Sequence, residues 1–444
     1  RQVSSKPRAA AQRLRRHNAN RVAARRVSRL CLYAMKIFYG WRMVAAGGAL
    51  QCLQALLLHQ AFGAYVAVLG QEFDWSKTEL SGAAVFQPLE AAMLGPILGM
   101  ILDRFGPRGM IRAGVFFLGV GFLFLGTIQS LAGFYAAFLV IAFGGSLCGF
   151  FPINVAIIHW FEKSRARALS ALSLGLSIGG MLVPIVAWSM QTWGWRATAF
   201  GSGAIALCIG LPLAQTFHRR PEDVGETIDG LPVVTNVASA QAQSTEGTEL
   251  SQREFSAREA LRTPAFWLLS LGHGFALLTV YAVSVHAIAH MKEGLGYTVA
   301  QASLFITLMT LSQTGGVLVG WWIGDRFQKR YVAAVCMLMH ASGLLALTFG
   351  VHPAILVAFA ILHGGAWGLR GPFMQAIRAD YFGRRAIGMI LGLSSLVIVL
   401  GQVGGPLIAG ALADATGNYR AGFTLLALMA GCGSLFFVLA KKPT

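Results

Sequence analysis

The chain has 444 residues, of which 55% are hydrophobic and 12% are charged, against roughly 25% charged residues in a soluble domain. Its mean hydropathy is +0.61 and its formal net charge is +18. This composition excludes a disordered protein and argues against an ordinary soluble globule. Long runs nearly free of charge argue against a hydrophobic soluble enzyme, because about 20 apolar residues are enough to span a bilayer.

A basic stretch opens the chain. Residues 1–34 contain only basic charges, and Met35 stands just before the first apolar run. We therefore interpret 1–34 as an upstream translated stretch or an idle basic tail that need not be native. The alternative is an organelle transit peptide, because the stretch contains Arg and Ser and lacks acids. We predict no nucleic-acid partner for it.

Apolar runs predict twelve membrane-spanning helices. Backbone polar groups inside a bilayer must be satisfied within each segment, and these runs do not alternate as barrel strands would. The fold class is therefore an all-α membrane protein. The predicted spans are 43–69, 79–102, 110–127, 133–158, 167–188, 197–217, 265–290, 301–324, 331–350, 354–377, 386–412 and 421–440.

One long polar stretch divides the chain into a six-helix unit at 35–217, a linker at 218–263 and a second six-helix unit at 264–444. Ser256 followed by Glu259 is a capping-box pattern, which predicts a short helix before the seventh span. Lys and Arg are concentrated in alternate loops. The positive-inside rule therefore places both termini in the cytoplasm. We expect the protein to lie in the cell (inner) membrane.

The two six-helix units repeat in sequence. Asp103-Arg104-Phe105 recurs as Asp325-Arg326-Phe327, Gly144-Gly145 with Pro152 recurs as Gly364-Gly365 with Pro372, and Pro184 recurs as Pro406, all near one offset. Carriers that work by alternating access have such repeats, with the substrate site near the bilayer midplane between them. A membrane enzyme or a receptor gives no reason for this layout, so we predict no enzymatic activity.

The stretch from Gly99 to Arg108, GMILDRFGPR, resembles the loop 2–3 signature of the major facilitator superfamily. The resemblance covers residues 35–444 and implies that fold and a monomer. It also implies that Asp103 faces the positive N-terminus of span 11. The residues to which it gives a gating role on the cytoplasmic side are Asp103, Arg104, Arg108, Asp325 and Arg326.

Within the superfamily, three local strings resemble the oxalate–formate antiporter and monocarboxylate transporter branch. They are Phe38-Tyr39-Gly40-Trp41, Trp160-Phe161 leading to Arg165 and Arg167, and Thr263-Pro264-Ala265-Phe266-Trp267. This resemblance implies a small organic anion as substrate, moved with protons or in exchange for a counter-anion. Members that bind oxalate or lactate often carry a basic residue in span 8 or span 11. In this sequence neither predicted span contains Lys or Arg. The polar residues there are Gln313 in span 8 and Ser394, Ser395 and Gln402 in span 11.

Arg370 is the deepest positive charge in the chain. It stands about seven residues inside the predicted end of span 10, or roughly 10 Å. A charge at that depth is costly and is expected to face a cavity or a partner. The planar guanidinium suits a carboxylate, because it can bond both oxygens. The alternatives are a structural ion pair and snorkelling to the interface.

Glu90 is the one acid well inside a predicted span, and burial would raise its proton affinity enough for a proton carrier. The alternative is a structural partner for Arg370. His59 also falls near mid-span and titrates near neutrality, so it is a candidate for proton coupling or binding, or a packing residue. The remaining substrate-binding candidates are Asn154 and Tyr281, chosen by depth, Trp367, which could close over a substrate or serve in packing, and Gln313 of span 8.

Several motifs are set aside. His286 and His290 lack a third metal ligand, so we predict no metal site. Gly175 to Gly179 match Gly-x-Ser-x-Gly but lie within a span, which indicates helix packing rather than hydrolysis. The chain has no phosphate-binding Gly-x-x-x-x-Gly-Lys-Ser/Thr sequence, which disfavours ATP-driven transport. We expect no cofactor.

We therefore predict a secondary active transporter, a symporter or antiporter, that moves a small organic anion such as a monocarboxylate by alternating access. The nearest alternative is a proton-coupled multidrug exporter in which Glu90 is the counter-charge. An alternative of another class is a transporter-like sensor that binds a ligand without flux.

Overall fold

The computed structural model describes residues 38–59, 61–75, 93–230 and 254–443. The basic tail, most of predicted span 2 and Glu90 lie outside these ranges.

The first unit is built from helices with short connections. They are α2 (Tyr39–Gln54), the π-helical turn η1 (Ala55–His59), α3 (Phe62–Phe73), a helical stretch at 93–105, α5 (Pro107–Leu125), α6 (Leu131–Cys148), α7 (Phe150–Trp160), α8 (Arg165–Met181) and α9 (Val183–Gln215). Gly149 separates α6 from α7 with extended backbone. The chain turns within α9 at Gly194, whose φ of 81° is left-handed and costs glycine little.

Helix α11 (Ala257–Leu261) lies at the end of the predicted linker and begins at the predicted capping box of Ser256 and Glu259. The spans that follow are α12 (Pro264–Leu295), α13 (Val299–Ile323), α14 (Lys329–Phe349), α15 (Pro353–Phe382), α16 (Ile387–Thr416) and α17 (Arg420–Leu439). The short 3₁₀ turns η2 (Pro221–Val224) and η3 (Ile228–Gly230) lie in the linker. Helix α15 continues to Phe382, five residues beyond the predicted end of span 10 at residue 377.

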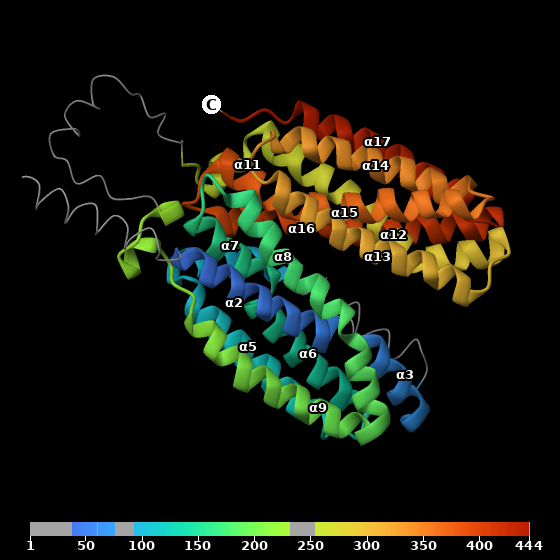
Figure 1. Cartoon of the computed structure of the whole chain (residues 1–444), viewed down its shortest axis with the longest axis horizontal. Helices are drawn as coiled ribbons and strands as arrows, with labels where there is room; N and C mark the ends of the chain where they lie inside the picture. Colours follow the sequence, from blue (N-terminus) through green and yellow to red (C-terminus); the bar gives the residue numbers. More distant parts are fainter. Residues whose placement is uncertain (1–37, 60, 76–92, 231–253, 444) are drawn as a thin grey trace, which may run out of the picture.

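Among the described residues, ten helical runs are long and apolar enough to cross a membrane. One of them, Arg165–Gln215, contains predicted spans 5 and 6, and span 2 lies partly outside the described ranges. The helices form two bundles (Figure 1), α2–α9 in blue to green and α12–α17 in yellow to red. The expected all-α membrane fold with two repeated units is confirmed.

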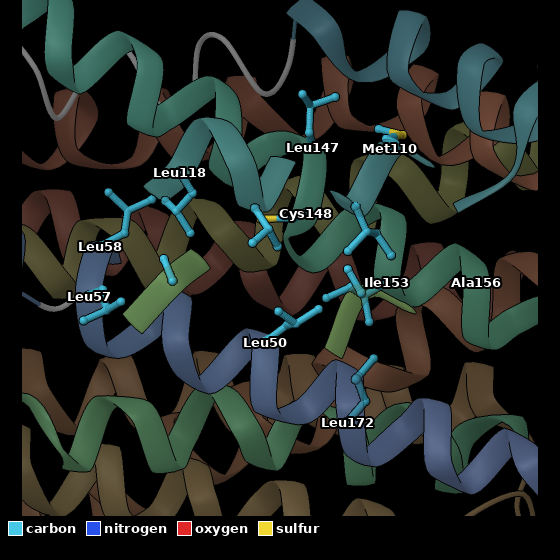
Figure 2. Close-up of a cluster of buried hydrophobic side chains, with 14 of the residues drawn as sticks. Leu50, Leu57, Leu58, Met110, Leu118, Leu147, Cys148, Ile153, Ala156 and Leu172 are labelled. Atoms are coloured by element: carbon cyan, nitrogen blue, oxygen red, sulfur yellow. The ribbon is translucent and has the colours of Figure 1, made fainter. Parts of the chain in front are cut away.

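Glycine contacts bring helices together inside each bundle. A Cβ placed on Gly175 of α8 would lie 1.9 Å from the Gly48 carbonyl oxygen of α2, and one on Gly401 of α16 would lie 2.0 Å from that of Gly274 in α12. Such backbone contact is possible only without a side chain. The packing interpretation of the Gly-x-Ser-x-Gly sequence is therefore confirmed. Apolar side chains such as Leu50 fill the core of the first bundle (Figure 2).

The two bundles meet at one end of the molecule, near α7 and α11, and diverge toward the end that carries α3 (Figure 1). We call the first the closed end and the second the open end. Helix α8 of the first bundle packs against α13 and α15 of the second. The two bundles are therefore in contact at the closed end and separate toward the open end.

Candidate functional site

A cavity of about 460 Å³ lies between the two bundles. Asn154 and Ser173 line it from the first bundle, and Tyr281 and Arg370 line it from the second. Small polar groups and aromatic rings make up much of its wall. Among the described lining residues, Arg370 and Arg378 are the arginines, and no lysine, aspartate or glutamate is present. The wall described here is therefore positively charged.

Arg370 is the side chain around which the site is built. It is 1% exposed, and its Nε and Nη1 atoms have no hydrogen-bond partner in the described part of the chain. It lies twelve residues before the end of α15 at Phe382, or roughly 18 Å at 1.5 Å per residue. Arg370 is thus deeper than predicted, near the middle of its helix, and the structural ion pair considered from sequence has no partner among the described residues.

The backbone beside Arg370 explains how the helix reaches the cavity. Gly368, two residues before it, lies so close to α13 that a Cβ would be 1.8 Å from the Gln313 carbonyl oxygen. Pro372 continues α15 without an amide hydrogen, which leaves the Gly368 carbonyl outside the helical hydrogen bonds. A close crossing on one face therefore fixes the segment that presents the guanidinium to the cavity.

Arg378 is a second buried guanidinium, two turns beyond Arg370, and the sequence analysis assigned it no role. Its Nη1 atom donates to the Met374 carbonyl at 2.8 Å, and its Nη2 atom donates to Ser394 Oγ at 2.9 Å. The same Nη2 lies 3.4 Å from His273 Nδ1. All of these acceptors are neutral, so they satisfy the donors of Arg378 without compensating its charge.

Four predicted substrate-binding residues, Trp367, Asn154, Tyr281 and Gln313, line the same cavity as Arg370. The Asn154 side-chain amide donates to the Phe150 carbonyl, and its Oδ1 atom has no partner among described residues. Gln402 donates to the Tyr281 hydroxyl at 3.3 Å. His59 lies in η1, but its side chain is outside the described part, as is all of Glu90.

At the closed end, Asp103 accepts hydrogen bonds from the backbone amides of Gly388 at 3.0 Å and Met389 at 2.9 Å. These amides begin α16, so the implied contact with the N-terminus of span 11 is confirmed. Burial raises the pKa of the Asp103 carboxyl to about 6, although both amides act to lower the pKa. Arg104 is exposed, with its guanidinium 5.3 Å from the centre of the Phe105 ring.

The second copy of the motif makes the matching contact. Asp325 accepts from the Ala166 amide at 3.0 Å, at the start of α8, and Lys329 pairs with it at 2.7 Å. Arg326 lies over the Trp322 ring at 5.7 Å. In the first copy, Arg108 donates to the Gln215 side chain at 3.3 Å. That these residues gate the pathway stays a prediction.

A cluster of charged residues that was not predicted as a site includes one ion pair between the bundles. Asp380 of α15 pairs with Arg165 of α8 and with Lys329 of α14, the latter at 2.7 Å. The Arg165 side chain is fully buried, whereas that of Asp380 is 27% exposed. Sequence could not reveal this pairing, because the residues stand far apart in the chain and were all assigned to solvated loops.

Within the described ranges, no three histidine, cysteine, aspartate or glutamate side chains gather as metal ligands. The five cysteines placed by the structure are all free thiols.

A family model described as Major Facilitator Superfamily matches residues 49–286 and 269–444. The chain belongs to this superfamily of membrane transporters. Monocarboxylate transporter 13 of Bos taurus is 22% identical over 415 residues, covering 91% of this chain and 92% of that protein. The membrane sensor protein UhpC of Escherichia coli strain K12 is 26% identical over 369 residues, covering 78% and 80%. The transporter FucP, solved in the outward conformation, has a TM-score of 0.67 at 16% identity, covering 90% and 99%.

Proposed function

We propose that this protein is a secondary active transporter that moves a small organic anion across the membrane by alternating access. The observation that carries the proposal is Arg370. It is a buried guanidinium at mid-helix whose Nε and Nη1 atoms lack partners among described residues, and it lines a cavity between the two bundles. A buried unpaired charge is costly. A carboxylate in the cavity would accept from it in the paired geometry that guanidinium favours.

The likeness to a protein named monocarboxylate transporter 13 supports a monocarboxylate as the substrate class. Asn154 and Tyr281 are then polar groups that orient the anion, and Trp367 supplies an aromatic wall. We assign the closed end to the cytoplasm because its loops carry most of the basic residues. The driving force is then a proton gradient or exchange for a second anion.

The closed-end contacts fit a carrier that opens alternately to each side. Asp103, Asp325 and Asp380 each join one bundle to the other. These contacts would have to break for the cavity to reach the cytoplasm.

A thermal-unfolding screen of the purified protein with lactate, oxalate, sugars and organic cations tests the proposal. Ligand at 100 times its dissociation constant stabilises the folded protein by about 2.7 kcal/mol. We expect a carboxylate to stabilise the wild type. The shift should disappear in Arg370→Gln and persist in part in Arg370→Lys, which keeps the charge without the planar fork.

Arg258→Gln, on the exposed surface of α11, is the matched control and should behave as wild type. Without ligand, Arg370→Gln should unfold at the same or a higher temperature than wild type, because it removes a buried unpaired charge. Equal stabilisation of wild type and Arg370→Gln by a carboxylate would show that Arg370 does not bind the anion.

A sensor without flux is the second candidate, because a relative is named membrane sensor protein UhpC. Carboxylate binding without counterflow in liposomes would favour it.

Multidrug export has a different test. Stabilisation by lipophilic cations, lost in Glu90→Gln and kept in Arg370→Gln, would favour the exporter.

A further inference from the structure

Two histidines form a buried pair in the second bundle. His340 of α14 and His363 of α15 are both 0% exposed, and their Nδ1 atoms are 3.2 Å apart. At this distance one Nδ1 must donate and the other must accept. The neutral pair therefore has one ring protonated at Nδ1 and the other at Nε2. Neither Nε2 atom has a partner among the described residues.

The pair lies close to the proposed anion site. His363 precedes Arg370 by seven residues on α15, which is two turns of the same face, or roughly 10 Å along the axis. Trp367 stands between them on that face and lines the cavity. A positive charge on the histidine pair would therefore be added near the positive charge already present on Arg370. Arg370 lines the cavity, and neither histidine of the pair does.

The surrounding elements offer few other charges. Cys336 stands one turn before His340 on α14, and His273 and Arg378 form a contact between α12 and α15 further toward the closed end. Helix α13 carries no titratable side chain, and α17 carries Arg420 at its outer end and the exposed Cys432. In the described part of this neighbourhood, no carboxylate faces the pair. An anion in the cavity would supply the missing negative charge.

We propose that the His340–His363 pair is the proton-binding site that couples proton uptake to anion binding at Arg370. This inference rests on the proposed function. A proton from solution adds to the free Nε2 lone pair of the ring that holds Nδ1–H. One N–H bond forms, no covalent bond breaks, and the two imidazoles share one positive charge. Release of the anion returns the proton to solution.

Electrostatics sets the size of the coupling. A unit charge about 10 Å away, at an effective dielectric constant near 20, changes a proton affinity by roughly tenfold. Arg370 adds to the cost of protonating the buried pair while the site is vacant, and a bound carboxylate offsets the part of that cost that Arg370 contributes. Reciprocity requires the proton to raise the anion affinity by the same factor. Anion and proton would then travel together as a symport pair.

The experiment measures protons taken up when lactate or oxalate is added to the purified protein in weakly buffered detergent solution with a pH indicator. We expect uptake of up to about half a proton per bound anion in wild type, which is the most that a tenfold change in proton affinity at one site can give. His340→Gln and His363→Gln should bind the anion with up to about tenfold altered affinity and without proton uptake. Their anion affinity should no longer vary with pH.

The matched control is His290→Gln. His290 is also buried, with Nε2 bonded to the Leu347 carbonyl at 3.1 Å and Nδ1 without a partner among described residues, but it lies toward the open end. The His290→Gln variant should therefore take up protons on anion binding as wild type does. Nitrogen-15 histidine spectra of wild type provide a measurement that needs no folded variant. An imidazolium signal should appear when the anion is added.

Proton uptake that persists in both pair variants and is lost in Glu90→Gln would overturn the inference and assign the proton to the carboxylate. Anion binding to wild type with neither proton uptake nor an imidazolium signal would overturn it as well, while leaving the anion site intact. Absence of lactate and oxalate binding to wild type would instead contradict the proposed function, and this inference with it.

Discussion

Asp380→Asn tests whether the closed end is sealed by the charges that join the two bundles. In the structure Asp380 of α15 pairs with the fully buried Arg165 of α8, and Lys329 remains paired with Asp325. The substitution therefore leaves mainly Arg165 without a counter-charge. In a state open at this end, water would solvate Arg165 instead. The substitution should therefore raise the free energy of the arrangement that is closed at this end, and leave that of the open arrangement unchanged.

The magnitude follows from burial. Breaking a fully buried pair costs about 3–5 kcal/mol, and an exposed pair contributes about 0–1 kcal/mol. Asp380 is 27% exposed, and Arg165 keeps a 3.0 Å hydrogen bond from Nε to the Phe161 carbonyl. An intermediate cost of about 2 kcal/mol corresponds to roughly a thirtyfold change in population. A carrier that is 99:1 in favour of the closed end would become about 3:1.

Spin labels across the closed end provide the assay. Cysteines replacing the exposed Glu222 of η2 and Arg258 of α11 report the separation of the two bundles, once other exposed thiols are removed. We expect a longer distance to gain population in Asp380→Asn. Glu72→Gln is the control, because Glu72 pairs with Arg196 inside the first bundle. An unchanged distribution in Asp380→Asn, or the same change in Glu72→Gln, would refute the reasoning.

Two further predictions concern stability. Gly175→Ala should lower the unfolding temperature sharply, because the added Cβ would overlap the Gly48 carbonyl oxygen of α2. Gly201→Ala is the control and should leave the unfolding temperature unchanged or raise it, because the space around Gly201 is open. Equal effects of the two substitutions in a melting experiment would contradict the close crossing. The pKa of Glu72 lies below its usual 4.5 because the Trp195 indole donates to it. Its stabilisation is therefore present above that value and lost as the pH falls through the lowered pKa, so melting curves should show an acid-dependent loss that is smaller in Glu72→Gln.

Much of the architecture could be predicted because it depends on local chemistry. A bilayer forces each long apolar run to become a helix, and the repeat of Asp103-Arg104-Phe105 marks the two units. Arg370 could be found for the same reason, since a lone charge in an apolar run is conspicuous. Asn154 and Tyr281 followed from depth alone, and both line the cavity.

Other parts of the site depend on contacts between distant segments. Arg378 was counted as a loop charge because its span was ended at residue 377, five residues too early. His340 and His363 each resemble an isolated packing histidine until α14 and α15 bring them together. The choice of which end is closed is a small free-energy difference between two arrangements of one sequence, and no local pattern encodes it.

The two acidic contacts at the closed end have a consequence for the origin of the fold. Asp103 binds the start of α16, and Asp325 binds the start of α8. Gly388 follows Ala166 by the same number of residues as Asp325 follows Asp103. Each unit thus supplies one acid and one helix start, which makes the interface self-complementary in the manner of a two-fold dimer. A single ancestral six-helix unit would already have carried both the acid and the helix N-terminus. Pairing with a second copy of itself would then have formed the contact twice.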